Sequence, residues 1–184
     1  METYEYVKDL YYNSIFNLTA IEENVHLALY SFAAFLVPFM LGHPQILVGC
    51  IVNCALILGA TYLKGHKLIP VILLPSIGVL TAGIMFGTFT PFLLIMVPFI
   101  WIGNAVYAYG YKALHSKTKS YLLSVGVSSI VKAGLLFSAA FALVSMNLLP
   151  AMFLTAMGWL QLTTALIGGV SAIIFIKSRQ AFAA

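Results

Sequence analysis

A single lysine, Lys132, lies inside an otherwise apolar stretch of the chain, residues 121–146. A lysine near the centre of a membrane span costs about 2.5–3.5 kcal/mol on insertion scales unless a partner offsets that cost. The usual partner is a carboxylate, but all five acidic residues precede residue 24. The remaining ways to offset the cost are backbone carbonyls or amide oxygens, a neutral amine, snorkelling toward lipid headgroups, and an acceptor on a ligand. Lys132 therefore indicates either structural pairing or binding of an anionic or strongly accepting group.

Other polar side chains occur at a similar depth in neighbouring apolar stretches. Counting about 1.5 Å of rise per residue places five polar residues in one central band. They are Asn53, Thr81, Asn104, Lys132 and Gln161. Each amide could simply bond to a neighbouring helix, an interaction worth roughly 0.6 kcal/mol on average. Because they share their depth with a lysine, we predict that the five residues line a common substrate-binding cavity.

Two short turns could form the mouth of such a cavity. His43 and Gln45 lie in one turn and Thr88 in another, and each is also an ordinary turn residue. We predict that His43 and Thr88 lie near the gate. Trp101 and Trp159 could stack on a planar ligand or pack against apolar neighbours.

Cys50 and Cys54 are four residues apart, so they share one face of a helix and are unsuited to a disulfide framework. Small packing residues are one interpretation, and a metal or redox site with His43 is another. The chain lacks a Gly-rich phosphate loop, a nucleophile motif and paired histidines at metal spacing. We therefore predict no enzymatic activity, no cofactor and no metal, and a membrane redox or metal enzyme is the third alternative.

The elements that must position these residues are membrane-spanning helices. The chain has 184 residues, of which 62% are hydrophobic and 8% are charged, and such a composition buries its apolar surface only in a bilayer. With about 20 residues per span, the length predicts an all-α integral membrane protein with six transmembrane helices. We expect these spans at about residues 26–41, 45–63, 68–86, 87–112, 121–146 and 150–176.

Two regions of unequal size follow from this count. Residues 25–180 form a single six-helix transmembrane domain. In residues 1–24, tyrosines and apolar side chains recur at spacings of three and four among charges. This pattern predicts an amphipathic helix that lies in the membrane interface and contacts lipids.

The positions of Lys and Arg predict the orientation. Basic segments follow the second, fourth and sixth spans, whereas the turns after the first, third and fifth contain neither residue. The positive-inside rule then places both termini in the cytoplasm, with the chain in the cell membrane. The cations occur singly or in pairs beside apolar spans, which argues against a nucleic-acid partner.

Four segments resemble a known family. They are FGTFTPFLL, PFIWIGNAVYAYGYKALHSK, SVGVSSIVKAGLLF and LQLTTALIGGVSAIIFIK. Over residues 42–177 the chain resembles the substrate-binding S component of energy-coupling factor (ECF) transporters. The resemblance depends on a small-residue loop and a Gly-Asn in the fourth span, a lysine in the fifth and a Gly-Gly in the sixth.

This resemblance implies a small six-helix protein with both termini inside that binds a vitamin or related micronutrient near the outer face. It also implies two kinds of partner, a transmembrane coupling protein and cytosolic ATP-binding cassette ATPases. Family members often present alanines four apart on the first span, and Ala28, Ser31, Ala33 and Ala34 approximate that pattern.

We therefore predict a membrane-embedded subunit of an ECF-type importer that binds a small solute from the extracellular side. The alternative is a non-transporting structural or assembly subunit of a membrane complex. In that case the polar residues only join helices together, and the Gly- and Ala-rich faces bind a larger assembly.

Overall fold

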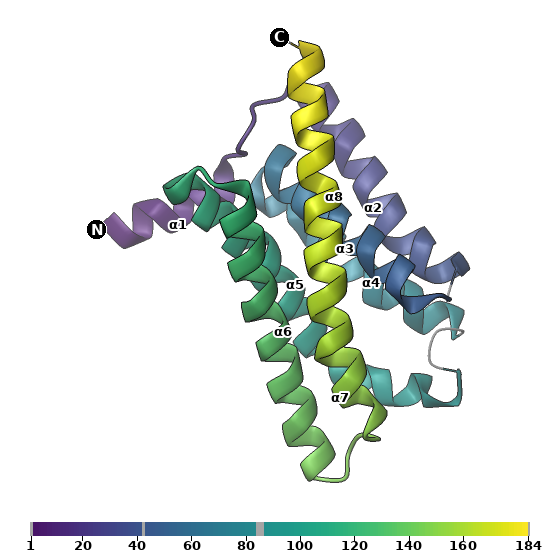
Figure 1. Cartoon of the computed structure of the whole chain (residues 1–184). Coiled ribbons are helices and arrows are strands. Elements are labelled where there is room, and N and C mark those ends of the chain that lie inside the picture. Colours follow the sequence, from purple (N-terminus) through teal and green to yellow (C-terminus); the bar gives the residue numbers. More distant parts are fainter. Residues whose placement is uncertain (1, 42, 84–86, 184) are drawn as a thin grey trace.

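The fold is a bundle of helices, seen in a computed structural model that describes residues 2–41, 43–83 and 87–183. Six helical segments are long and apolar enough to cross a membrane, and the described residues contain no strand (Figure 1). The prediction of an all-α, six-helix membrane protein is thereby confirmed. In chain order the elements are α1 (Glu2–Tyr12), α2 (Ala20–Leu41), α3 (Gln45–Tyr62), η1 (Gly65–Leu68), α4 (Ile69–Ala82), η2 (Gly87–Phe89), α5 (Thr90–Thr118), α6 (Tyr121–Ser145), α7 (Met152–Met157) and α8 (Trp159–Ala183).

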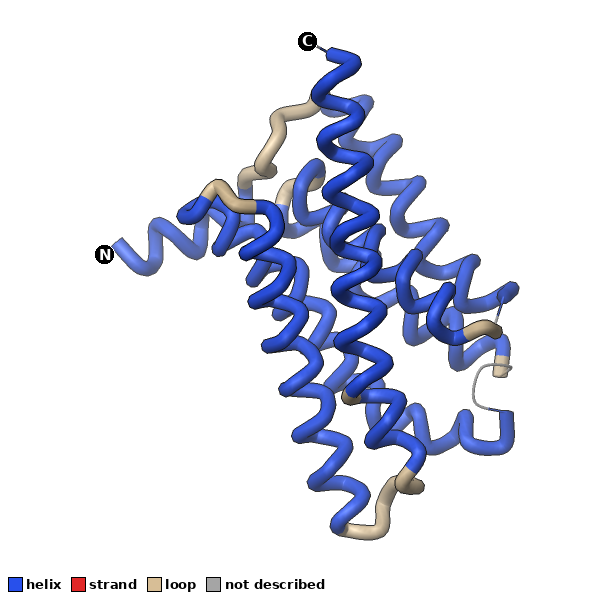
Figure 2. The backbone as a smooth tube through the Cα atoms, viewed as in Figure 1, coloured by secondary structure: helices blue, strands red, loops and turns tan. Residues whose placement is uncertain are grey.

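The first span starts at Ala20, about six residues earlier than the sequence interpretation placed it. Thr19 and Glu22 form a capping box: the Glu22 carboxylate accepts from Thr19 N at 2.9 Å, and Glu22 N donates to Thr19 Oγ1 at 3.3 Å. The helix therefore begins among charged residues. In Figure 2 a tan loop separates α1 from α2, so residues 2–24 are not one continuous helix.

The sixth span consists of two helices, because α7 ends at Met157, Gly158 is its C-cap, and α8 begins at Trp159. Gly158 has φ −98° and ψ −95°, far from helical values, which separates the two helices at this residue. The fourth span is longer than expected, since α5 continues through the basic segment to Thr118.

Close packing of α3 against α8 depends on a glycine. A Cβ added at Gly168 would overlap the Cys50 carbonyl oxygen and the Cβ of Asn53. The same holds for α2 and α4, where a Cβ at Gly78 would overlap the carbonyl oxygen of Phe35. Glycine allows such close approach of backbones in membrane bundles, and it brings Asn53 directly against α8.

The bundle has two chemically different ends. The basic end holds the α3–η1 turn, the α5–α6 turn and the last turns of α8, and it lies in the upper half of Figure 1 together with α1. It carries Lys64, Lys67, Lys112, Lys117, Lys119, Lys177 and Arg179. The opposite end holds the described turn residues 41, 43–45, 83, 87–90 and 146–151, and none of them is Lys, Arg, Asp or Glu.

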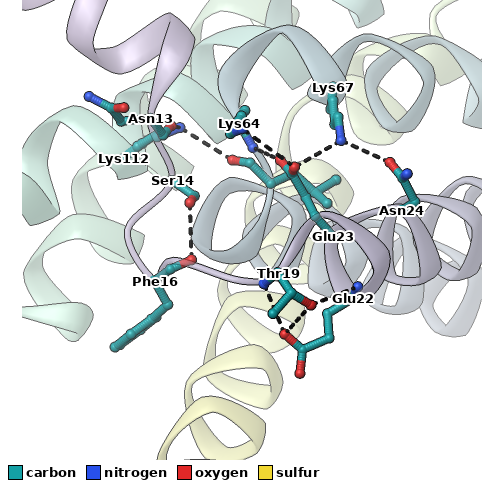
Figure 3. A network of polar contacts seen from close by, with 11 residues as sticks. Asn13, Ser14, Phe16, Thr19, Glu22, Glu23, Asn24, Lys64, Lys67 and Lys112 are labelled. Atoms are coloured by element: carbon teal, nitrogen blue, oxygen red, sulfur yellow. Dashed lines mark hydrogen bonds and ion pairs between the residues drawn. The ribbon is translucent and has the colours of Figure 1, made fainter.

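A buried carboxylate joins two elements at the basic end (Figure 3). Glu23 accepts hydrogen bonds from Lys64 N and from Lys67 Nζ, both at 2.8 Å, and Lys67 Nζ also donates to Asn24 Oδ1 at 2.8 Å. Lys112 Nζ donates to the Asn13 carbonyl oxygen and ties the α1–α2 loop to α5. The Glu23 carboxylate is thus committed to the basic end.

Candidate functional site

A cavity of about 90 Å³ lies inside the bundle. Its lining comes from the C-terminal part of α2, the N-terminal halves of α3, α5 and α8, and from α4, α6 and α7. Those parts of α2, α3, α5 and α8 belong to the opposite end, so the cavity is displaced away from the basic residues. Its polar lining side chains are Gln45, Asn53, Ser76, Asn104, Lys132, Gln161 and Thr164.

Lys132 is the central polar residue of the cavity and is only 2% exposed. Its Nζ donates to Asn53 Oδ1 at 2.6 Å. The same nitrogen lies 5.1 Å from the centroid of the Tyr107 ring, a cation–π distance. The Tyr107 hydroxyl donates to the Ala165 carbonyl oxygen at 2.7 Å, which fixes the ring that the amine faces.

Asn53 is oriented toward Lys132 by its own amide group. Its Nδ2 donates to the Gly49 carbonyl oxygen at 2.9 Å and to Thr164 Oγ1 at 3.2 Å. Thr164 in turn donates to the Leu160 carbonyl oxygen at 2.8 Å. Because both amide hydrogens are used in this way, Oδ1 is the atom that remains to accept from the lysine.

Lys132 retains hydrogen-bonding capacity. An ammonium group has three N–H donors, and only one of them has an acceptor within the described part of the chain, namely Asn53 Oδ1. No Asp or Glu lines the cavity within residues 2–41, 43–83 and 87–183. The local arrangement therefore stabilises the amine only in part and leaves it able to bond to a further acceptor.

Several other polar groups facing the cavity have unused hydrogen-bonding capacity. Ser76 Oγ is buried and makes no hydrogen bond with the described residues. Asn104 Nδ2 donates to the Ile72 carbonyl oxygen at 3.1 Å, which leaves its Oδ1 free. The side chains of Gln45 and Gln161 are half-buried and make no hydrogen bond within the described ranges. Buried polar groups normally find a partner, so these groups suit a ligand or water.

The rest of the lining is aliphatic. No aromatic or acidic side chain contributes to it among the residues the structure covers. The apolar walls are formed by Pro38, Val48, Val52, Pro75, Val79, Leu93, Ile100, Ala156, Met157 and Leu160.

No protein-family model, curated protein or solved structure matches the chain. The six long apolar helices identify it as a multi-pass membrane protein. Beyond that, the chemistry of the cavity and the distribution of charge are what bear on its function.

Four of the five residues expected in the central band do line the cavity: Asn53, Asn104, Lys132 and Gln161. Thr81 does not. It is exposed, and its hydroxyl donates to the Ile77 carbonyl oxygen at 2.8 Å. Five residues separate Thr81 from Ser76, which turns its side chain about 140° away around the axis of α4. Depth alone placed Thr81 in the band, but its angular position directs it outward.

The two residues expected near the gate do not line the cavity either. His43, between α2 and α3, and Thr88, within η2, are both exposed. Gln45, two residues after His43, contributes to the lining instead because it lies on the first turn of α3. The tryptophans are elsewhere: Trp101 Nε1 donates to the Leu73 carbonyl oxygen at 3.2 Å, and Trp159 is 71% exposed.

Three important residues of the site were not among the predicted ones: Ser76, Tyr107 and Thr164. Ser76 and Thr164 carried a usable signal, since each is a polar residue within an apolar span. Thr164 also follows Gln161 by three residues and precedes Gly168 by four, so all three share one face of α8. Tyr107 carried no such signal, because a tyrosine near the end of a span is normally an interfacial anchor.

The alternative of a metal or redox site at Cys50 and Cys54 is not supported by a cluster of metal-ligating side chains in the described residues. Cys50 and Cys54 are free thiols on α3. Within residues 2–41, 43–83 and 87–183, no three His, Cys, Asp or Glu side chains gather as a metal site would require. Cys50 instead contributes its backbone carbonyl to the close contact with Gly168.

Proposed function

We propose that this chain is the solute-binding subunit of an importer, similar to the S component of an ECF transporter. The observation that carries the proposal is Lys132, a buried amine whose single acceptor among the described residues is Asn53. It faces a cavity with no carboxylate among its described lining residues. A solute that supplies an acceptor group would complete the pairing that the helices leave unfinished.

The unused polar groups support binding over a purely structural role. Residues that only join helices would use their donors and acceptors on one another, as Asn53 and Thr164 do. Ser76 Oγ, Asn104 Oδ1 and the Gln161 amide instead face a common space. Leaving several polar groups unpaired in a bundle costs stability, and a function in binding explains why the cost is tolerated.

The distribution of charge supports entry from outside. We propose that the basic end faces the cytoplasm, that both termini lie there, and that the chain resides in the plasma membrane. The cavity lies toward the opposite end, so its solute would come from the extracellular side. Energy for import would come from partners, a transmembrane coupling protein with ATP-binding cassette ATPases, as the family resemblance implies.

A solute carried through purification tests this function. The full chain would be purified in detergent and examined by native mass spectrometry, as wild type, Lys132→Met and Lys177→Met. Lys177 is the matched control, because it is an exposed lysine at the basic end. We expect a bound small molecule in the wild type and the control, and its loss in Lys132→Met.

The opposite result is equally informative. Absence of a solute from all three proteins, together with a membrane partner that co-purifies regardless of Lys132, would contradict a binding function. That pattern would favour a structural or assembly subunit instead.

A further inference from the structure

We propose that the cavity selects a small aliphatic carboxylate, with about six to nine non-hydrogen atoms, over aromatic, cationic or neutral solutes of similar size. This inference rests on the proposed function, because it takes the cavity to be a solute site and asks which solute fits. Three properties of the lining lead to it: its charge, its wall chemistry and its volume.

The charge of the lining favours an anion. Lys132 is the only ionisable side chain among the described lining residues, and the five acidic residues of the chain all lie in its first 23 positions. A cationic solute would meet an amine and no carboxylate in a medium that screens charge poorly. A carboxylate would instead accept hydrogen bonds from the N–H groups of Lys132 that do not donate to Asn53.

A carboxylate also suits the other unpaired groups. Each carboxylate oxygen can accept more than one hydrogen bond. Lys132 alone would therefore leave some of these acceptor positions unused. Ser76 Oγ is buried, unpartnered and able to donate, and the Gln161 amide has two free donors. These groups and Lys132 come from three different helices, α4, α8 and α6, around one space.

The walls favour an aliphatic body. Branched and unbranched aliphatic side chains from α3, α4, α5 and α8 form the apolar surface, with Val48, Val79 and Leu93 almost fully buried. Planar aromatic ligands are commonly held by stacking on aromatic rings, and no aromatic ring lines this space in the described ranges. Tyr107 faces Lys132, but its ring is engaged by the amine.

The volume limits the size. About 90 Å³ is available, and on this measure each water-sized position takes about 10–15 Å³. The cavity therefore has room for about six to nine such positions, which corresponds to a short branched-chain acid.

Calorimetry with a size-matched set of probes tests the selectivity. The full chain in lipid nanodiscs would be titrated with isovalerate, its isosteric amide isovaleramide, the cation isopentylamine and the aromatic acid benzoate. We expect isovalerate to bind, the amide and benzoate to bind at least about tenfold more weakly, and the amine to give no measurable binding. Lys132→Met should abolish the preference for isovalerate over its amide, and Lys177→Met should preserve it.

Selectivity of the wild-type protein tests the inference even if Lys132→Met does not fold. Ser76→Ala provides a milder second variant, which we expect to bind isovalerate several-fold more weakly. Thermal unfolding checks that this variant is folded. Equal or tighter binding of benzoate, isovaleramide or isopentylamine would overturn the inference. So would an unchanged preference in a folded Lys132→Met protein.

Failure of the inference is distinguishable from failure of the proposed function. If no probe binds but mass spectrometry finds another solute that depends on Lys132, the chain is a solute-binding subunit and the substrate class is wrong. If no probe binds and no solute is present, both proposals are overturned.

Discussion

At the scale of single residues, the pair formed by Lys132 and Asn53 decides how the cavity is interpreted. An amide oxygen at 2.6 Å stabilises an ammonium less than a carboxylate does, because it carries only a partial charge. The pair thus leaves N–H donors of Lys132 unused beside the cavity. A lysine with a buried acid as its partner would have no comparable need for an anionic ligand.

Replacing this amide by an acid separates folding from binding. We expect Asn53→Asp to unfold at a temperature between those of the wild type and Asn53→Leu, because Lys132 gains a counter-charge while the hydrogen bond donated to the Gly49 carbonyl oxygen is lost. The same variant should bind the solute at least about tenfold more weakly, since the introduced carboxylate competes with the ligand for the Lys132 amine. Differential scanning fluorimetry and calorimetry on one preparation measure both effects.

Asn53→Leu is the matched control for that experiment. It removes the acceptor without supplying a charge, so it should lower the unfolding temperature, consistent with a cost of about 1–3 kcal/mol for a buried polar group left unsatisfied. If Asn53→Asp bound solute as well as the wild type, Lys132 would not be the group that holds the ligand.

At the scale of helices, the contact between α3 and α8 positions the polar centre. The two helices form one of the most extensive pairs in the bundle, together with α5 and α6. Gly168 permits the close approach, and Gly49 lies against Thr164 a little further toward the opposite end. The hydrogen bond from Asn53 to Thr164 spans this contact, so its length depends on the separation of the two backbones.

A single methyl group tests this dependence. Gly168→Ala should destabilise the protein by about 1–3 kcal/mol and weaken solute binding, because the added Cβ would overlap Cys50 and Asn53 and push α8 away. Gly126→Ala on α6 is the control, since a Cβ there meets no atom within 4 Å. It should be neutral or stabilising by up to about 1 kcal/mol, because alanine favours a helix. Equal effects of the two substitutions on unfolding temperature would argue against close packing at Gly168.

At the scale of the whole molecule, the two ends differ enough to set an orientation. Counting Lys8 on α1, eight of the nine cations lie at the basic end, and the turns of the opposite end carry no charged residue. The buried network around Glu23 adds a structural role for this asymmetry, because it ties the start of α2 to Lys64 and Lys67 (Figure 3). The charged residues at this end therefore have two effects: they join α2 to η1, and they favour the cytoplasmic side of the membrane.

Thiol labelling tests the orientation. In a background with Cys50→Ser and Cys54→Ser, Met146→Cys places a thiol in the α6–α7 turn, and Ser178→Cys places one near the end of α8. Both native side chains are exposed. We expect a membrane-impermeant maleimide to label Met146→Cys in intact cells and Ser178→Cys only after permeabilisation. The reverse pattern would invert the orientation and place the cavity toward the cytoplasm.

The sequence by itself determined the class of the protein and the approximate limits of its spans. Apolar stretches of about 20 residues need a bilayer whatever their arrangement, and a turn interrupts them wherever Gly, Pro and polar residues gather. It also determined depth, because the rise per residue of a helix is constant. Lys132, Asn53, Asn104 and Gln161 were found in this way.

Only the tertiary structure decided which of these residues meet. Rotation of each helix about its axis depends on packing against several neighbours, so depth could not show that Thr81 faces outward while Ser76 faces the cavity. The partner of Lys132 lies 79 residues away on another helix, and Tyr107 joins it only because α5 and α6 pack along their length. A hydrogen bond between helices forms through their relative separation and rotation, and a linear pattern specifies neither of these.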